Sequence, residues 1–452
     1  MNYLGYPQYQ ESNAVWLGRI PSHSKVHRLK WSVTGCSNGV WGTEPDGVDD
    51  VVCVRVADFN RETLTVGIDS LTNRAVEPNQ LETRKLQRGD LLLEKSGGGE
   101  KQLVGCVVYF DHDFDAVCSN FVARMPIEPM LSARYWCYVH AGLYAGKLNY
   151  PAIKQSTGIQ NLDANEYLNT LAAYPPADEQ QQIAAFLDWK TGQIDALIAK
   201  KKELLEKLKE KRLAVITQAV TKGLDPNAPM RDSNIPWLDE VPAHWDIRRL
   251  KFAASAPLKY GANEAAELND PELPRYIRIT DVKDDGNLHE GTFRSLPLDI
   301  AAPYLLEDGD ILLARSGATV GKSFQYLNAW GRSAYAGYLI RFRADLTLVS
   351  PRFAYYFLRS ELYWASVNSS LIQSTIQNFS AEKYADINFV LPPLEEQKLI
   401  VQFLEVNLAR LEEMQNATGS AIARLTEYRT ALITAATTGK IDVRQVAIPA
   451  PT

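Results

Sequence analysis

Two stretches of the chain, YPPADEQQQIAAFLD (174–188) and LPPLEEQKLIVQFLE (391–405), are near copies of one another. Each begins with a proline pair, continues with acidic residues, and then carries apolar residues at helical spacing. Proline is tolerated at a helix entrance, and acidic side chains in the first turn suit the helix dipole. Each stretch therefore predicts the start of a helix, and the recurrence indicates an internal repeat.

Three further blocks recur in the same order and at nearly the same spacing. The pairs, first copy before second, are VWLGRIPSHSKVHRLKW (15–31) with PWLDEVPAHWDIRRLKF (236–252), RGDLLLEKSG (88–97) with DGDILLARSG (308–317), and STGIQNL (156–162) with STIQNF (374–379). A period of about 220 residues is too long for a solenoid repeat. The sequence therefore predicts a duplicated module in which a globular domain precedes a long helix.

The two long helices are expected to pack against each other. From Asp178 to Thr221 there is no proline, and Lys222 followed by Gly223 is typical of a helix end. Apolar residues recur close to heptad spacing, so each helix needs an apolar partner, which the other copy's helix can supply. The predicted contact residues are Leu187, Ile194, Leu197, Leu204, Leu208 and Val215 in the first helix, and Leu404, Leu408, Leu411, Ile422, Leu425, Leu432 and Ala436 in the second.

The globular parts mix short strands with a few helices. Residues 51–59 and 276–288 read as a strand followed by a turn, whereas 130–144 and 350–368 have apolar residues at helical spacing. The predicted fold class is α+β: two homologous globular domains, each followed by a long helix, with the helices pairing as an antiparallel coiled coil of pseudo-two-fold symmetry. The predicted segments are a first domain (1–174), a first spacer helix (175–222), a linker (223–235), a second domain (236–391), a second spacer helix (392–440) and a tail (441–452).

One motif suggests nucleotide binding, but its spacing is wrong. SGATVGKS (316–323) ends like a P-loop, yet only three residues separate Gly317 from Gly321, and the first copy has no equivalent G-K-[ST]. The YPP and LPP triplets lack the flanking residues of an amino-methyltransferase motif, and we find no nucleophile elbow or metalloprotease signature. We therefore expect no catalytic and no metal-binding residues.

Composition is that of an ordinary globular protein. The 452 residues are 46% hydrophobic, enough for two to four domains. The longest apolar runs are too short to span a membrane, the N-terminus does not resemble a signal peptide, and five cysteines without a C-x-x-C pair suit a reducing cytoplasm. The net charge of −6 argues against a protein that coats nucleic acid, but not against one that reads it through a single basic face.

The order of a globular domain, a P-P-x-x-E-Q helix, a second globular domain and a P-P-x-E-E-Q helix resembles the specificity subunit of type I restriction-modification systems, over essentially the whole chain. The resemblance implies two target-recognition domains, each reading one half of a split, asymmetric site in double-stranded DNA. It implies a non-catalytic phage-defence protein of the prokaryotic cytoplasm. Two methyltransferase subunits would bind around the helices, and restriction/translocase subunits would join later. S-adenosylmethionine, ATP and Mg would belong to those partners, and no cofactor to this chain.

The alternative is a coiled-coil scaffold for protein partners without DNA contact, which the acidic net charge slightly favours. We interpret the basic stretch from Lys200 to Arg212 as the solvated face of a coiled coil, with contact to DNA phosphate between the two domains as the alternative.

Candidate DNA-binding residues are polar side chains in turns, since Arg and Lys suit guanine, and Asn and Gln suit adenine. Those in turns found in both copies are Lys95, Ser96 and Lys101 in the first, and Arg315, Ser316 and Lys322 in the second. A second group, which we interpret as differing between the copies, is Tyr260, Arg275, Arg278 and Arg332. Ser156, Thr157, Gln160 and Asn161, with Gln377 and Asn378 in the second copy, belong to a shared segment that we interpret mainly as framework.

Overall fold

The computed structural model describes residues 3–48, 50–99, 102–156, 158–235, 237–283, 286–372 and 378–449. The chain divides into two compact units. The first unit comprises Met1–Lys202 and Gly419–Thr452, and the second comprises Glu203–Thr418. Each long helix therefore contributes one part to each unit.

The central sheets of the two units share one strand order. Within the described residues, the first unit has a six-stranded sheet in the order β4 (Ser37–Asn38), β13 (Val122–Met125), β9 (Leu91–Glu94), β11 (Val107–Tyr109), β7 (Thr65–Val66) and β6 (Phe59–Asn60). The sheet of the second unit runs β20 (Lys259–Tyr260), β25 (Leu339–Phe342), β22 (Ile311–Ala314) and β23 (Ser323–Gln325). The first four strands correspond one to one, so the duplication predicted from the sequence is confirmed.

Smaller sheets repeat as well. In the first unit β5 (Asp50–Val54) lies parallel to β12 (Ala116–Cys118) and antiparallel to β8 (Thr72–Ala75), while in the second β21 (Arg275–Ile277) lies parallel to β24 (Ser333–Tyr335). Four two-stranded antiparallel pairs are β1 (Tyr9–Glu11) with β2 (Arg19–Pro21), β3 (Lys25–Arg28) with β16 (Leu171–Tyr174), β17 (Met230–Asp232) with β18 (Glu240–Pro242), and β19 (Asp246–Arg249) with β26 (Asn388–Leu391). The strands expected in 51–59 and 276–288 are therefore present.

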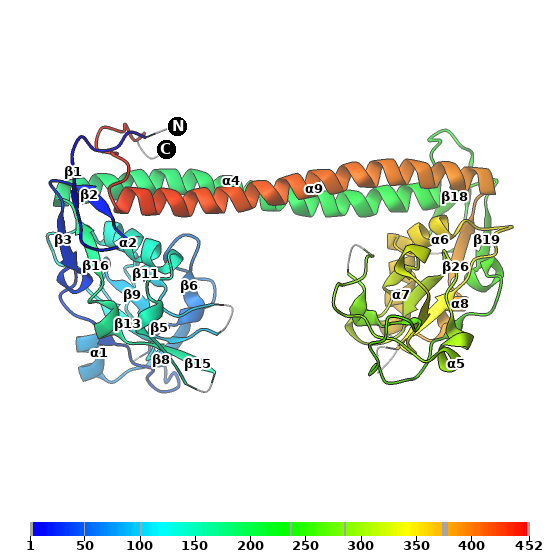
Figure 1. Cartoon of the computed structure of the whole chain (residues 1–452), viewed down its shortest axis with the longest axis horizontal. Coiled ribbons are helices and arrows are strands. Elements are labelled where there is room, and N and C mark those ends of the chain that lie inside the picture. The colour runs from blue at the N-terminus through cyan, green and yellow to red at the C-terminus, as the bar shows by residue number, and fades with distance from the viewer. Residues whose placement is uncertain are drawn as a thin grey trace. The chain divides into compact units, whose positions relative to one another are not determined.

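Three short strands and several helices complete the domains. β15 (Ile159–Leu162) pairs with β10 (Ser96–Gly97) and β14 (Ile153–Ser156), and the short helices are α1 (Pro78–Arg84), α3 (Ala164–Tyr167), α5 (Leu298–Ala301) and α8 (Ala381–Ala385). The helix predicted at 130–144 is α2 (Ala133–Ala145), which Figure 1 shows between the sheet and the long helices of its unit.

The prediction of one helix over 350–368 is wrong, because this stretch forms α6 (Pro351–Phe357) and α7 (Glu361–Ile372). Ser360 separates them. Its hydroxyl donates to the Phe357 carbonyl at 2.7 Å and accepts from the Tyr363 amide at 3.3 Å, so it acts as an N-cap for α7.

The long helices are α4 (Ala177–Lys222) and α9 (Leu394–Thr437), and they begin directly after the proline pairs (Figure 1). In the first unit, Ile194 of α4 shares a buried core with Leu432, near the end of α9. In the second unit, Ile216 near the end of α4 shares a core with Leu404, near the start of α9. In each unit, taken by itself, the helix segments run in opposite directions, as predicted for an antiparallel pair.

Most of the residues predicted to lie in the helix contact are buried or partly buried. Leu187, Leu208, Leu404, Leu408, Leu411 and Ala436 are buried like Ile194 and Leu432, while Val215, Ile422 and Leu425 pack against the cores as partly buried residues. Leu197 and Leu204 were predicted wrongly, because their side chains are 44% and 39% exposed. Ile198, four residues after Ile194 and therefore on the same helix face, takes the buried position instead.

The glutamine of the repeated P-P-x-x-E-Q motif connects each long helix to its globular domain. In the second unit Gln397 is fully buried, and its amide donates to the Pro392 carbonyl at 2.8 Å and the Leu348 carbonyl at 2.9 Å. Its oxygen accepts from the amide of Ser350, directly before α6, at 2.8 Å. One side chain thus satisfies three backbone groups that would otherwise be buried without partners.

The first unit repeats this arrangement. Gln180 donates to the Pro175 carbonyl at 2.9 Å and accepts from the amide of Ser132, directly before α2, at 3.2 Å. The glutamate before each glutamine also bonds to the domain: Glu179 accepts from Tyr6 at 2.6 Å, and Glu396 from Trp245 at 3.0 Å. The repeated motif is therefore a structural joint.

Replacing Gln397 with alanine should lower the free energy of unfolding of the second unit by about 1–3 kcal/mol per unsatisfied backbone group that water cannot reach. Urea unfolding followed by tryptophan fluorescence measures the change, since Trp245 lies at this joint. The matched control is Glu395→Ala, an exposed residue two positions earlier on the helix. Equal unfolding midpoints for the two variants would contradict the role assigned to Gln397.

Candidate nucleic-acid interface

Lys95 and Arg315 occupy equivalent positions, directly after strands β9 and β22. Lys95 donates from Nζ to Asn38 Oδ1 at 2.6 Å. The Arg315 guanidinium lies 4.8 Å from the ring centre of Tyr260, on the strand equivalent to that of Asn38. The basic residue and its neighbour therefore change together between the copies, from lysine with asparagine to arginine with tyrosine.

The serines that follow are held by equivalent asparagines. Ser96 Oγ lies 2.5 Å from Asn161 Oδ1, and Ser316 forms an isolated antiparallel bridge with Asn378. Gln160 is buried and accepts from the Val104 amide at 3.2 Å, which agrees with a framework role. Lys101, Thr157 and Gln377 lie outside the described residues.

Arg278 is not a residue that differs between the copies, so that interpretation was wrong. It follows β21, and its guanidinium forms two hydrogen bonds with buried Asp281, at 2.7 and 3.0 Å. After the equivalent strand β5, Arg55 bonds to buried Asp58 at 2.8 and 3.2 Å. The shared R-x-x-D pair stabilises a tight turn in both units, and sequence comparison missed it because the surrounding residues differ.

The three remaining candidates lie close to these turns. Arg275 is half-buried over the ring of Phe293, at 5.6 Å, and burial lowers the pKa of its guanidinium. Its amide donates to the carbonyl of Arg332, whose side chain is exposed. Lys322 lies directly before β23. A DNA-contacting role for these three residues stays a prediction.

The P-loop-like stretch 316–323 connects two strands. β22 is followed by a 3-10 turn at Gly317–Thr319 and then by β23, where a phosphate-binding loop would be followed by a helix. Gly321 has a φ of +85°, and a Cβ atom there would lie 2.7 Å from the Trp364 ring. Glycine is required at this position for packing, so the nucleotide-binding interpretation is excluded.

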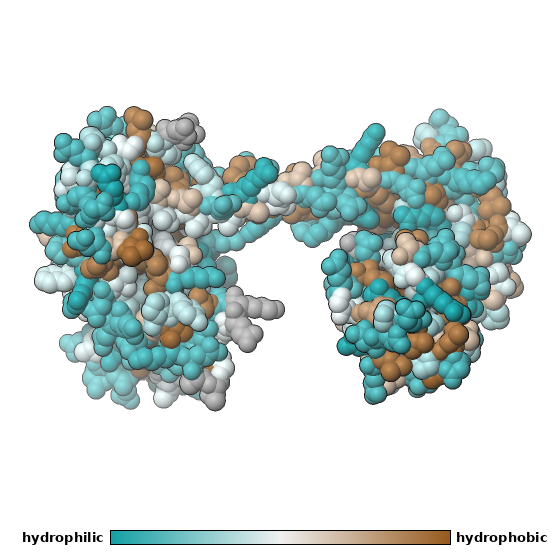
Figure 2. All heavy atoms as spheres, viewed as in Figure 1, coloured by the Kyte–Doolittle hydropathy of each residue, from teal (hydrophilic) through white to brown (hydrophobic). Residues whose placement is uncertain are grey.

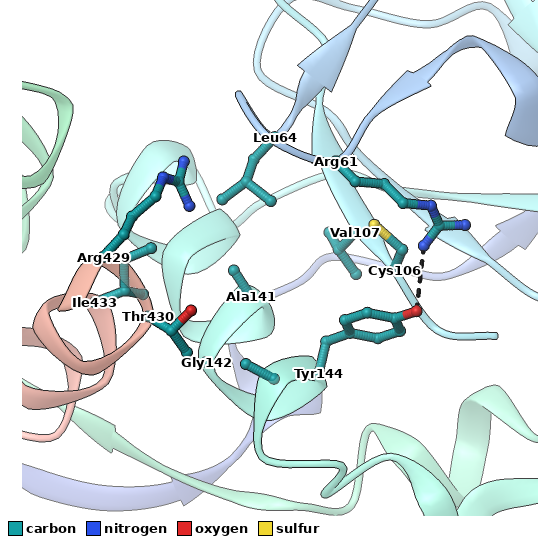
Figure 3. A pocket seen from close by; sticks show the side chains of 11 residues that line it. Arg61, Leu64, Cys106, Val107, Ala141, Gly142, Tyr144, Arg429, Thr430 and Ile433 are labelled. Atoms are coloured by element: carbon teal, nitrogen blue, oxygen red, sulfur yellow. Dashed lines mark hydrogen bonds between the residues drawn. The ribbon is translucent and has the colours of Figure 1, made fainter. Parts of the chain in front are cut away.

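A small cavity of about 130 Å³ in the first unit lies beside α2 and the last part of α9 (Figure 3). Its two arginines already have acidic partners: Arg61 bonds to Glu94 at 2.8 Å, and Arg429 to Asp195 at 2.8 Å. The rest of the lining is largely apolar. We regard this cavity as a packing gap between the domain and the helix pair.

The described residues contain no cluster of three or more histidine, cysteine, aspartate or glutamate side chains that could hold a metal ion. None of their helices is long and apolar enough to cross a membrane.

The second domain is similar to a known protein family. Residues 263–418 match the family model described as "Type I restriction modification DNA specificity domain". This stretch is therefore similar to type I DNA specificity domains. It contains the turn at Arg315, the R-x-x-D pair and the first part of α9.

The chain as a whole is similar to specificity subunits. It is 24% identical over 378 residues to the type I restriction enzyme StySPI specificity subunit of Salmonella potsdam, which covers 80% of this chain and 77% of the relative. It is also 24% identical over 375 residues to the EcoKI specificity subunit of Escherichia coli, with the same coverage. The resemblance predicted from the repeated motifs is confirmed.

The fold is also known from solved structures. A chain described under "Structural basis underlying complex assembly and conformational transition of the type I R-M system" matches with a TM-score of 0.71 at 15% identity, over 92% of this chain and 98% of that one. The predicted combination of α+β domains and long helices is therefore confirmed.

Replacing Arg278 with alanine should destabilise the second unit by about 2–3 kcal/mol, because Asp281 would remain buried without its partner. The loss should be smaller than for a fully buried ion pair, because Arg278 is partly exposed and solvent screens its charge. Urea unfolding measures the loss. Arg332→Ala, which removes an exposed arginine, should change stability by less than about 0.5 kcal/mol. Unchanged stability of Arg278→Ala with an altered DNA preference would instead support a reading role.

Proposed function

We propose that this chain is the specificity subunit of a type I restriction-modification system, and that each unit reads one half of a split, asymmetric DNA site. The observation that carries the proposal is the duplication: the units share strand order, the R-x-x-D turn and the glutamine joint, yet differ in exposed side chains around that framework. One framework presenting two different surfaces is suited to two different half-sites, and the two long helices would hold the readers together.

The chemistry belongs to partner subunits in this proposal. Methyltransferase subunits would bind S-adenosylmethionine and modify adenine, and restriction/translocase subunits would use ATP and Mg. This chain would supply sequence recognition in the cytoplasm of a prokaryotic cell, and no catalytic step.

The part of α9 in the second unit carries a second apolar stripe that suits a protein partner. Leu399, Phe403, Val406 and Met414 follow helical spacing and are 41% to 57% exposed, while the buried contacts to α4 lie on another face. Figure 2 shows apolar atoms among hydrophilic ones on the surface of the helices. A paired helix needs one apolar stripe, so a second, exposed stripe marks an interaction site. We propose that a methyltransferase subunit docks there.

Mapping methylated adenines tests the DNA-reading function. The chain, co-expressed with the methyltransferase encoded beside it, should direct methylation to one bipartite sequence with a fixed gap. Purified complex should bind that duplex with an affinity that falls steeply between 50 and 200 mM salt, by about 10³-fold or more if six or more phosphates are contacted. Salt-independent binding or methylation without sequence preference would favour the scaffold alternative.

The docking proposal predicts that Phe403→Glu combined with Val406→Glu weakens association with the methyltransferase subunit about tenfold or more, because charge replaces buried apolar contact. Size-exclusion chromatography and calorimetric titration measure the loss. Leu346→Glu, which places a charge at an exposed leucine outside the helices, is the control. Unchanged affinity of the double variant would move the docking site elsewhere.

A further inference from the structure

A hollow of about 470 Å³ in the first unit opens between two exposed aromatic side chains. Trp41 is 37% exposed and Phe121 47% exposed, and the hollow between them is also lined by Ala57, Ser96 and Asn120. Large aromatic rings at the surface forgo the stabilisation that burial would give them, and two of them around one hollow mark an interaction surface. Of the candidates chosen from the sequence, Ser96 lines the hollow, whereas neither Trp41 nor Phe121 was chosen.

The second copy of the domain provides an internal comparison. Gly39 and Gly261 each lie very close to the backbone of a neighbouring segment. A Cβ atom on Gly39 would lie 1.9 Å from the Cys118 carbonyl oxygen, and one on Gly261 would lie 2.2 Å from the Tyr335 carbonyl oxygen. The backbone register is therefore shared on both sides of the hollow. In the first unit the Lys95 amide donates to the Phe121 carbonyl at 2.8 Å. In the second unit the Arg315 amide donates to the Tyr338 carbonyl at 3.0 Å. Phe121 and Tyr338 are thus equivalent.

With this register, the lining residues fall into two classes. The framework residues are the same in both units: Arg55 with Arg278, Ser96 with Ser316, and Gly97 with Gly317. Four other residues of the lining differ between the units: Trp41 corresponds to Asn263, Ala57 to Thr280, Asn120 to Gly337, and Phe121 to Tyr338. Exposure is retained at the aromatic position, since Phe121 is 47% and Tyr338 62% exposed. A constant framework with a variable, exposed lining is the pattern expected of a surface that distinguishes two targets.

We propose that Phe121 and Tyr338 contact base edges in the two halves of the DNA site, within reading surfaces formed by this hollow in the first unit and by the equivalent residues in the second. The inference rests on the proposed function and identifies where that function resides. Phenylalanine offers apolar contact to a thymine methyl group, and tyrosine adds a hydroxyl that can donate or accept. In both units the carbonyl of the aromatic residue accepts a hydrogen bond from the amide of a basic residue, Lys95 or Arg315, which suits a base contact near a phosphate contact.

The test uses the full chain in complex with its methyltransferase subunits. Duplexes that carry each possible base at each position of the recognised site are methylated by wild type, Phe121→Ala and Tyr338→Ala. Phe121→Ala should reduce discrimination about tenfold or more at one or two positions of one half-site and leave the other half unchanged. Tyr338→Ala should do the same in the opposite half. Phe121→Tyr and Tyr338→Phe, which alter a single oxygen atom, should shift base preference at those same positions without loss of thermal stability.

Trp31→Ala and Phe252→Ala are the matched controls, since these equivalent aromatics are 64% and 60% exposed but lie outside the hollow. They should leave every base preference unchanged. If wild type reads a bipartite site while the Phe121 and Tyr338 variants retain full discrimination, or lose methylation equally at all positions, the inference is overturned and the proposed function stands. If wild type itself shows no sequence preference, the proposed function fails first.

Discussion

The buried glutamine after each proline pair is the contact on which the architecture of each unit depends. The first backbone amides of a helix have no partner within the helix. The proline pair before it has no N–H groups, so it cannot donate hydrogen bonds to nearby backbone carbonyls. Gln397 and Gln180 satisfy such groups on the entering chain and bind the amide before a helix of the globular domain. Rotation of the domain on its helix would break these bonds together. The domain is thereby held in one orientation relative to the helix that leaves it.

A second joint acts at the end of each helix, and the two units build it from different parts of the chain. In the second unit, Lys222 at the end of α4 donates to the Glu240 carbonyl in the segment that follows. In the first unit, Lys440 after α9 donates to the Arg19 carbonyl at 2.6 Å, more than four hundred residues earlier. The tail after α9 thus takes the place that the 223–235 linker has after α4. In each unit the start of one long helix and the end of the other are therefore tied to the domain.

The repeat and the helix starts could be predicted because they depend on local, periodic signals: paired prolines, first-turn acids and apolar spacing. The helix face could be predicted only approximately, since Leu197 and Ile198 are both apolar and only packing decides which is buried. The division between α6 and α7 depends on one serine hydroxyl, which propensity does not register. Arg278 was misjudged because its partnership with Asp281 requires a turn geometry that pairwise comparison of the copies did not reveal.

The same cases show why sequence difference alone does not identify a DNA-reading residue in a duplicated protein. Gln160 is shared and buried, and its bond to the Val104 amide fixes a turn. Arg278 is shared and held by a carboxylate, so its charge serves the fold. A reader must differ between the copies, remain exposed in both, and stand on backbone that does not differ. Phe121 and Tyr338 meet all three conditions, because the same main-chain hydrogen bond holds both residues while their side chains face solvent. That combination follows from the physical demand on a specificity module, whose frame must stay constant while its contact surface changes.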